Sequence, residues 1–481
     1  MSLPAPRAPG ALSDRDAVAR ALDRAAGARP IAGNALQHYP DSAAAIQAML
    51  DLIAAAKQWV HFENYIIRDD RTGRRFADAL AERAQAGVRV RVLYDAFGSL
   101  GTAGGFWRRL RQAGVEVRAF HPILTSRPFR VFWRDHRKLL VADGTRAMLG
   151  GLCIGNEWAG DPARDRQPWR DTMVAVRGPA VTALDRTFGR VWRRAGAPLP
   201  PDELAGSGEP CGSSAVRVLE GVPGQSRTYR AVQALAASAS ERLWITDAYL
   251  VAPAPLFASL LDAAREGVDV RLLVPGASDL PVLRNFTRVG YRELLQAGVR
   301  IFEWQGPMLH AKTTIADRRW ARVGSSNLNV SSLLTNYELD LLAEGGDLAD
   351  ELAAQFRRDL AWSREIVLRT GGRISRPRLV GAPTAADALH PPRPAGPVVP
   401  HKRSGYELGT VAVVALRRVA GGVRRAIAGT AALTFVTLGA LLLAFPKVMS
   451  VALAVGAFWL ALGLTLYAFE RRRSQQGEDG D

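Results

Sequence analysis

The sequence predicts an α/β protein made of two pseudo-symmetric α/β sandwich domains, followed by a C-terminal transmembrane helical hairpin. Strand-like and helix-like segments alternate along most of the chain, which is typical of α/β folds. One short pattern, His-x-Lys followed by four residues and Asp, occurs at residues 136–143 and again at 310–317. Two long runs without a charge lie near the C-terminus. These three features indicate a duplicated body and a membrane segment.

The duplication extends beyond the short pattern. Residues 84–91 match residues 264–271, and residues 112–115 match residues 296–299. Each copy reads as strand, helix, strand, helix and strand, and then as a further strand that carries the His-x-Lys pattern. We therefore expect the two copies to fold alike.

The first elements of each copy give the clearest signals. We expect strands at residues 59–67 and 243–251 and helices at residues 74–86 and 255–266. A glycine follows each helix, and glycine commonly stops helices because it adopts left-handed backbone angles without a steric cost.

Composition divides the chain further. Residues 1–30 are rich in alanine, arginine and proline, without an apolar core of signal-peptide length, and we expect a disordered or weakly helical N-terminal arm. The other expected segments are a first sandwich domain at 31–200, a second at 213–372, a Pro-rich linker at 373–415, a basic-flanked transmembrane hairpin at 416–473 and an acidic tail at 474–481.

The hairpin prediction depends on two apolar runs at residues 427–445 and 448–469. At 1.5 Å per residue each run is roughly 28–33 Å long, about the thickness of the hydrocarbon layer. Arginines flank both ends of the pair, so the positive-inside rule places both ends in the cytoplasm. We expect a multi-pass protein of the inner (cytoplasmic) membrane, with its catalytic body on the cytoplasmic side. The alternative is a buried helical pair in a soluble domain.

The net charge of +17 favours an anionic partner, such as a nucleic acid or an anionic membrane surface. The alternative is a uniformly basic protein with solvated arginines. The two cysteines, Cys153 and Cys211, do not make a disulfide framework, which favours a reducing compartment.

The paired pattern predicts phosphoryl chemistry without a metal. Residues two apart on a strand share a face, so His136 and Lys138 would point the same way, as would His310 and Lys312. If both pairs line one cleft, a phosphodiester there meets two ammonium groups, a histidine nucleophile and a histidine acid. One pair alone is compatible with an ordinary structural histidine. The remaining histidines are scattered, so we expect no metal and no cofactor.

The two motifs, with the segments at 62–67, 245–250 and 324–328, resemble the phospholipase D superfamily. Within it, residues 40–370 are most similar to the bacterial phospholipase D-type cardiolipin synthases.

This resemblance implies a two-step mechanism. His136 would attack phosphorus and form a phosphohistidine, and His310 would exchange protons with the leaving and incoming alcohols. The residues alone do not rank the two histidines. Lys138, Lys312 and Asn327 would bind the phosphate and stabilise the pentacovalent phosphorus.

Two carboxylates are candidate partners that fix the tautomers of the imidazoles. We expect Glu338 to pair with His310 and Asp171 to pair with His136, each within its own copy. The alternative for each is an ordinary surface carboxylate.

Three further positions belong to the candidate site. Asp143 and Asp317 complete the two motifs. Because they lie further along the strands, we expect them to hold the turn that follows each strand and not to take part directly in catalysis. The family pattern has asparagine at the position of Cys153, and the second copy keeps that asparagine as Asn327. A thiol is a weak donor, so we expect the first copy to lose a phosphate contact.

The function we expect is a phosphatidyltransferase that joins two phosphatidylglycerol molecules into cardiolipin and glycerol. Its partners would be anionic phospholipids and the membrane, and not nucleic acid. One alternative is a phospholipase D that passes the phosphatidyl group to water or another alcohol. Others are a phosphodiesterase nuclease, which the basic charge permits, and a catalytically weakened lipid-binding protein, which only Cys153 favours.

Overall fold

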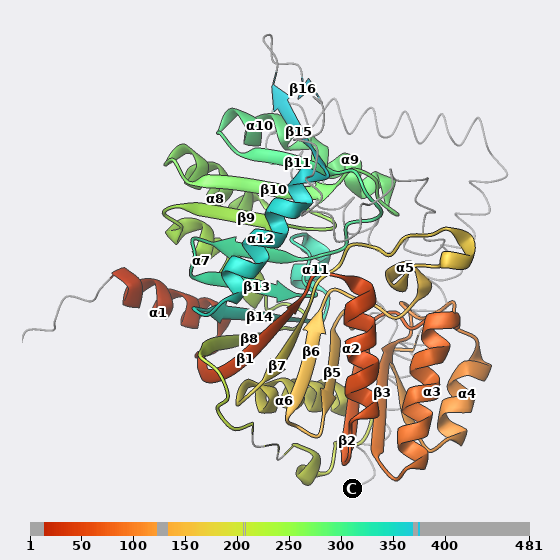
Figure 1. Cartoon of the computed structure of the whole chain (residues 1–481). Helices are drawn as coiled ribbons and strands as arrows, with labels where there is room; N and C mark the ends of the chain where they lie inside the picture. Colours follow the sequence, from red (N-terminus) through yellow and green to blue (C-terminus); the bar gives the residue numbers. More distant parts are fainter. Residues whose placement is uncertain (1–13, 123–132, 205, 207, 369–373, 376–481) are drawn as a thin grey trace, which may run out of the picture. The chain divides into compact units, whose positions relative to one another are not determined.

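The computed structural model of the chain describes residues 14–122, 133–204, 206, 208–368 and 374–375 (Figure 1). The expected transmembrane hairpin, the acidic tail and all but two residues of the expected linker lie outside the described residues. Within the described part of the chain, no helix is both long and apolar enough to span a bilayer.

The first half comprises residues 31–204. Its elements are β1 (Ile31–Tyr39), α2 (Ser42–Ala54), β2 (Trp59–Asn64), α3 (Arg71–Gln85), β3 (Arg89–Asp95), α4 (Gly104–Gln112), β4 (Glu116–Phe120), β5 (Lys138–Ala142), β6 (Arg146–Gly150), α5 (Asn156–Ala159), η2 (Pro162–Arg164), β7 (Met173–Arg177), α6 (Ala180–Arg194) and η3 (Pro201–Leu204).

The second half comprises residues 214–375. Its elements are β8 (Ser214–Gly221), α7 (Arg227–Ser238), β9 (Arg242–Thr246), α8 (Ala254–Arg265), β10 (Asp269–Pro275), α9 (Pro281–Val289), α10 (Tyr291–Gln296), β11 (Arg300–Trp304), β12 (Thr313–Ala316), β13 (Trp320–Gly324), α11 (Val330–Leu334), β14 (Glu338–Glu344), α12 (Leu348–Ala361), β15 (Ser363–Leu368) and β16 (Ile374–Ser375).

The two halves repeat one strand order. The first runs β1-β7-β6-β5-β2-β3-β4, and the second runs β8-β14-β13-β12-β9-β10-β11 before it adds β15 and β16. In the first half, β2, β3 and β4 run parallel to one another, and in the second half β9, β10 and β11 do the same. The other neighbouring strands in each half are antiparallel. β1 and β8 pair with each other and join the halves into one mixed sheet. The predicted duplicated α/β fold is therefore confirmed.

Local sequence signals explain where the outer helices begin and end. The Asp70 side chain caps α3 by accepting a hydrogen bond from the Gly73 amide at 2.9 Å. After α3 and α8 the chain turns through Gly87 and Gly267, whose φ angles of 88° and 93° are left-handed. These are the glycines that the sequence marked as helix stops.

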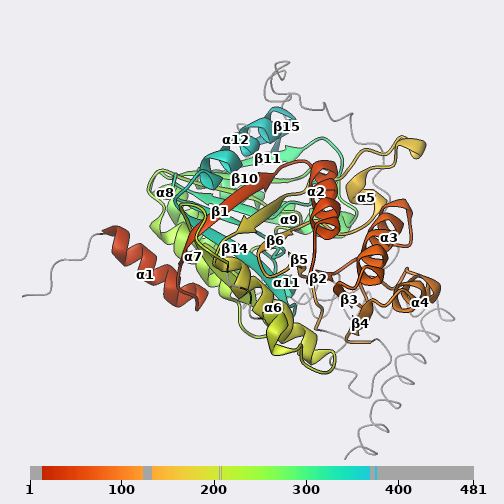
Figure 2. The same cartoon turned by 60° about the horizontal axis from the view of Figure 1, so that its bottom comes forward.

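Three apolar clusters organise the layers. One lies between the first-half sheet and α2, α3 and α4, and another between the second-half sheet and α7, α8 and α10. The third contains side chains of α6, α12 and strands of both halves. Figures 1 and 2 show α12 lying across the second-half strands and α6 packed on the first-half strands. The halves therefore share a central core within one unit.

The described part of the expected N-terminal arm is an ordered helix. Residues Asp14–Ala26 form helix α1, which packs against α7. Leu22 and Ala26 are fully buried there, and Arg217 donates a hydrogen bond to Asp23 at 2.7 Å. An apolar stripe among the alanines and arginines supplies enough buried surface to order the helix.

Candidate active site

The two motif histidines lie just before strands β5 and β12, not within them. The His136 amide donates to the Tyr337 carbonyl at 2.9 Å, and the His310 amide donates to the Arg170 carbonyl at 2.7 Å. Tyr337 belongs to the second half and Arg170 to the first. The expected strand placement is therefore corrected, because the backbone at each histidine pairs with the opposite half.

Each imidazole bonds a carboxylate of the opposite half. His136 Nδ1 lies 3.0 Å from both carboxylate oxygens of Glu338, and His310 Nδ1 lies 2.6 Å from Asp171 Oδ2. The expected pairing of Glu338 with His310 and of Asp171 with His136 is therefore wrong. The physical reason lies in the backbone pairing between the halves. Glu338 directly follows Tyr337, whose carbonyl accepts from the His136 amide, and Asp171 directly follows Arg170, whose carbonyl accepts from the His310 amide.

Hydroxyl and amide groups surround the carboxylate of Glu338. Ser325 and Ser332 donate to its two oxygens, and the Asn336 amide donates at 3.4 Å. Burial nevertheless raises the pKa of Glu338 to about 7. This carboxylate is therefore close to its protonation point at neutral pH.

The carboxylate of Asp171 has a different electrostatic environment. The Trp158 indole donates to Asp171 Oδ2 at 3.2 Å. Burial acts to raise the pKa of Asp171, but His310 and Lys312 outweigh it and leave the pKa below its ordinary value. Asp171 is therefore ionised at neutral pH, unlike its counterpart Glu338.

The two motif lysines are almost fully buried beside their histidines. Lys138 Nζ donates to the His136 carbonyl at 2.5 Å, and Lys312 Nζ donates to the His310 carbonyl and lies 2.9 Å from His310 Nδ1. Burial and the charge of Lys138 lower the pKa of Lys312 to about 8.

The same surroundings keep both imidazoles neutral. Burial and Lys312 lower the pKa of His310 to about 3, and burial with Lys138 and Lys312 holds the pKa of His136 well below its ordinary value. The site therefore concentrates positive charge on two ammonium groups and leaves the imidazoles unprotonated.

Asn327 is buried, yet among the described residues neither its amide oxygen nor its amide nitrogen has a hydrogen-bond partner. A buried polar group without a partner costs about 1–3 kcal/mol. Its amide therefore has hydrogen-bonding groups that no described residue uses.

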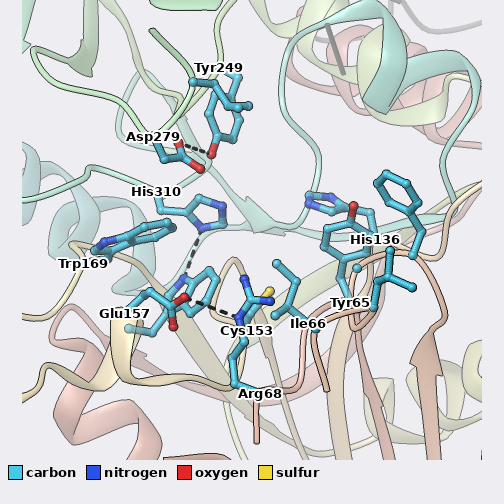
Figure 3. A pocket seen from close by; sticks show the side chains of 16 residues that line it. Tyr65, Ile66, Arg68, His136, Cys153, Glu157, Trp169, Tyr249, Asp279 and His310 are labelled. Carbon is cyan, nitrogen blue, oxygen red and sulfur yellow. Dashed lines mark hydrogen bonds and ion pairs between the residues drawn. The ribbon is translucent and has the colours of Figure 1, made fainter. Parts of the chain in front are cut away.

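One cavity of about 260 Å³ connects the two halves of the site. His136, His310 and Cys153 line it, and Figure 3 shows the two imidazoles on opposite sides. The Tyr65 ring lies edge-on to His136 at 4.8 Å between centroids, and the Trp169 ring lies 5.6 Å from His310. The predicted convergence of the two motifs on one cleft agrees with this geometry.

Comparisons with known proteins agree with this arrangement. Residues 49–192 and 232–360 match the family model described as "Cardiolipin synthase, PLD-like domain". The chain belongs to this phospholipase D-like family. Cardiolipin synthase A of Pseudomonas entomophila (strain L48) is 34% identical over 364 residues, 74% of each chain. Cardiolipin synthase A of Pseudomonas aeruginosa (strain LESB58) is 35% identical over 350 residues, 72% of this chain and 71% of that one.

A solved structure supports the fold alone. Phosphatidylserine synthase from Haemophilus influenzae Rd KW20 matches with a TM-score of 0.57 and 17% identity, covering 73% of this chain and 92% of that one. The fold of this chain is therefore shared with that phosphatidylserine synthase.

The last residues of the two family motifs lie away from the cavity lining. The Asp143 carboxylate accepts hydrogen bonds from the amides of residues 57–59, and the Asp317 carboxylate accepts them from the amides of residues 240–242. Each therefore ties its turn to the segment that enters β2 or β9. We expected each aspartate to hold the turn that follows its strand, whereas each carboxylate instead binds the amides that precede β2 or β9.

Cys153 is fully buried at the position that corresponds to Asn327, and burial raises the pKa of its thiol. It is therefore a neutral thiol on the cavity wall. Within the described part of the chain, no group of three or more His, Cys, Asp or Glu side chains could hold a metal ion.

Sequence reasoning missed several lining residues of this family member. Tyr65 and Tyr249 lie in the segments that carried the resemblance, and Trp169 lies two residues before Asp171, so proximity to the motifs was a usable signal. Asp279 gave no signal, because it lies in the connection between β10 and α9, away from every sequence motif.

Proposed function

We propose that the protein is a phosphatidyltransferase that joins two phosphatidylglycerol molecules into cardiolipin and glycerol. One observation carries this proposal: two histidines line a single cavity, each bonded to a carboxylate of the opposite half and each beside a buried lysine. Family membership supports the same reaction.

In the first step, His136 Nε2 attacks the phosphorus of one phosphatidylglycerol. The bond from phosphorus to the glycerol oxygen breaks, and His310 Nε2 gives its proton to that oxygen. Glu338 holds His136 through Nδ1, so Nε2 faces the substrate as the nucleophile.

In the second step, a hydroxyl of the second phosphatidylglycerol attacks the phosphohistidine. Its oxygen bonds to phosphorus, the bond from phosphorus to His136 Nε2 breaks, and the hydroxyl proton passes to His310. The ionised Asp171 stabilises the imidazolium that forms on His310.

The low pKa values of the free site fit this order of events. A neutral His136 is ready to attack, whereas a neutral His310 needs a proton before it can act as an acid. A bound phosphodiester brings a negative charge that offsets the two lysines and raises the pKa of the imidazoles. Substrate binding would therefore charge the acid of the first step.

Three donors would stabilise the pentacovalent phosphorus: Lys138, Lys312 and the amide of Asn327. They are buried and fixed in place, so their charge or dipole acts in a site of low dielectric without reorganisation. Loss of one such donor costs on the order of 3 kcal/mol of barrier.

Localisation follows from the same proposal. The apolar runs at 427–445 and 448–469 would anchor the enzyme as a hairpin in the inner membrane, with the catalytic body on the cytoplasmic side. A net charge of +17 would hold the cavity close to anionic phospholipids.

The test is to incubate the full-length protein with phosphatidylglycerol labelled in its headgroup glycerol and to resolve the products. We expect cardiolipin and free glycerol in equal amounts, and no product from His136→Ala. Phosphatidic acid as the sole lipid product, or normal turnover by His136→Ala, would contradict the proposal.

A further inference from the structure

The cavity walls differ on the two sides of the paired histidines. Tyr65 stands beside His136, and the segment 97–101, which packs on Tyr65 at Gly98, contributes a phenylalanine, a leucine and two glycines to the lining. A Cβ on Gly98 would come within 2.3 Å of the Tyr65 carbonyl oxygen, so this wall has no room for a further side chain there. The His136 side therefore offers apolar and main-chain surface.

The His310 side carries a buried pair of polar side chains. The Tyr249 hydroxyl donates to Asp279 Oδ1 at 2.8 Å, and both residues line the cavity (Figure 3). Asp279 is only 2% exposed, and the Tyr249 ring lies 6.0 Å from the His310 ring between centroids. A carboxylate buried this deeply is costly to keep, which indicates a use for it.

The fold fixes this carboxylate instead of leaving it on a loose loop. Helix α9 lies between β10 and α10, whereas the first half has no helix between β3 and α4. Leu283 and Phe286 of α9 pack in one apolar cluster with Tyr249 and Met308. The cluster holds the start of α9, and with it Asp279, against the cavity.

We propose that Tyr249 and Asp279 form the subsite for the alcohol that leaves and enters at phosphorus, and that this subsite selects a glycerol-type polyol. The inference rests on the proposed phosphatidyl transfer. The leaving and incoming alcohols occupy the same side of phosphorus, because one histidine exchanges protons with both. That histidine is His310, and the polar pair stands on its side of the cavity.

The chemistry of the pair matches neighbouring hydroxyls. A carboxylate accepts hydrogen bonds only, and a tyrosine hydroxyl both donates and accepts them. The reacting hydroxyl gives its proton to His310 as its oxygen bonds to phosphorus, and the adjacent hydroxyl donates to Asp279 without taking part in the reaction. A site that binds hydroxyls discriminates against an analogue without them, because its own polar groups then stay unpaired.

The test uses the full-length protein in mixed micelles with phosphatidyl-p-nitrophenol as donor. Release of p-nitrophenol measures total turnover, and equal concentrations of glycerol and 1-propanol compete for the phosphatidyl group. We expect the wild type to prefer glycerol. Asp279→Asn and Tyr249→Phe, both close in shape to the native side chains, should reduce the ratio of glycerol to propanol products about tenfold or more.

Release of p-nitrophenol, a leaving group that needs no acid, gives the total turnover of each variant, and the ratio of glycerol to propanol products is compared at that turnover. Asp262→Asn, at an exposed carboxylate on α8, is the matched control and should keep the wild-type ratio. Unchanged ratios in both cavity variants, or no glycerol preference in the wild type, would overturn the inference. Formation of phosphatidic acid alone by the wild type would instead contradict phosphatidyl transfer itself.

Discussion

Lys312 is the cationic residue of the site whose charge changes nearest to neutral pH. Its pKa of about 8 means that the ammonium is present below that pH and is lost as the pH rises through it. We therefore expect kcat/KM, which reports the free enzyme, to fall above about pH 8 as the phosphate loses one cationic partner.

The conservative variant tests this assignment. Lys312→Arg keeps its charge to high pH, so the alkaline fall should move beyond the measured range, although the different shape of the guanidinium lowers the overall rate. Lys57→Arg changes an exposed lysine and should leave the profile unchanged. An alkaline fall that stays near pH 8 in Lys312→Arg would show that another group titrates.

Cys153 is the residue at which the two halves differ most clearly in donor strength. Cys153→Asn introduces an amide donor on the cavity wall, so we expect kcat to be retained or raised by up to about tenfold, the equivalent of ~1.4 kcal/mol. Steady-state rates of cardiolipin formation measure the effect. Cys153→Ala, which has no donor, should be no faster than the wild type. A large loss in Cys153→Asn with activity kept in Cys153→Ala would contradict the placement of this position beside the phosphate.

We expect the turns after β5 and β12 to contribute to stability and not to chemistry. Asp317 has a φ of 51° and accepts hydrogen bonds from three consecutive amides. Asp317→Ala removes these bonds and places a Cβ without a polar group in a left-handed conformation, so we expect a loss of about 1–3 kcal/mol of stability. The melting temperature should fall, whereas kcat of the folded protein should stay within about threefold.

Asp317→Asn is the control, because asparagine tolerates the left-handed conformation and keeps an acceptor oxygen. It should lie between the wild type and Asp317→Ala in melting temperature. A large fall in kcat without a change in melting temperature would instead assign Asp317 to the reaction.

The elements also show how far sequence patterns reached. Helices α3 and α8 carry periodic apolar residues and end at glycines, so their positions were predictable to within a few residues. Helix α9 was not predicted, because it has no counterpart in the first half against which to align it. Its role depends on an apolar cluster that forms only when Tyr249 and Met308 are brought beside it.

At the scale of the whole molecule, neither motif histidine finds its carboxylate partner within its own half. Glu338 should support the step in which His136 attacks, and Asp171 the step in which His310 accepts a proton. With phosphatidyl-p-nitrophenol, Glu338→Gln should slow the initial burst of p-nitrophenol. Asp171→Asn should keep the burst and slow the later steady state, each by about 10²-fold or more.

The opposite pattern, with the burst slowed only in Asp171→Asn, would show that His310 is the nucleophile. Equal effects of both variants on both phases would show that the two pairs do not act separately. Asp262→Asn serves again as the control and should leave both phases unchanged.

The sequence by itself determined the duplication, the alternation of strands and helices in each copy and the identity of the two histidines and two lysines. These features are local, since they follow from periodicity, helix stops and a repeated motif. Only the tertiary structure decided which carboxylate serves which histidine, because that depends on how the two halves dock. Within one copy Glu338 and His310 looked like natural partners, yet backbone pairing between the halves delivers Glu338 to His136 and Asp171 to His310.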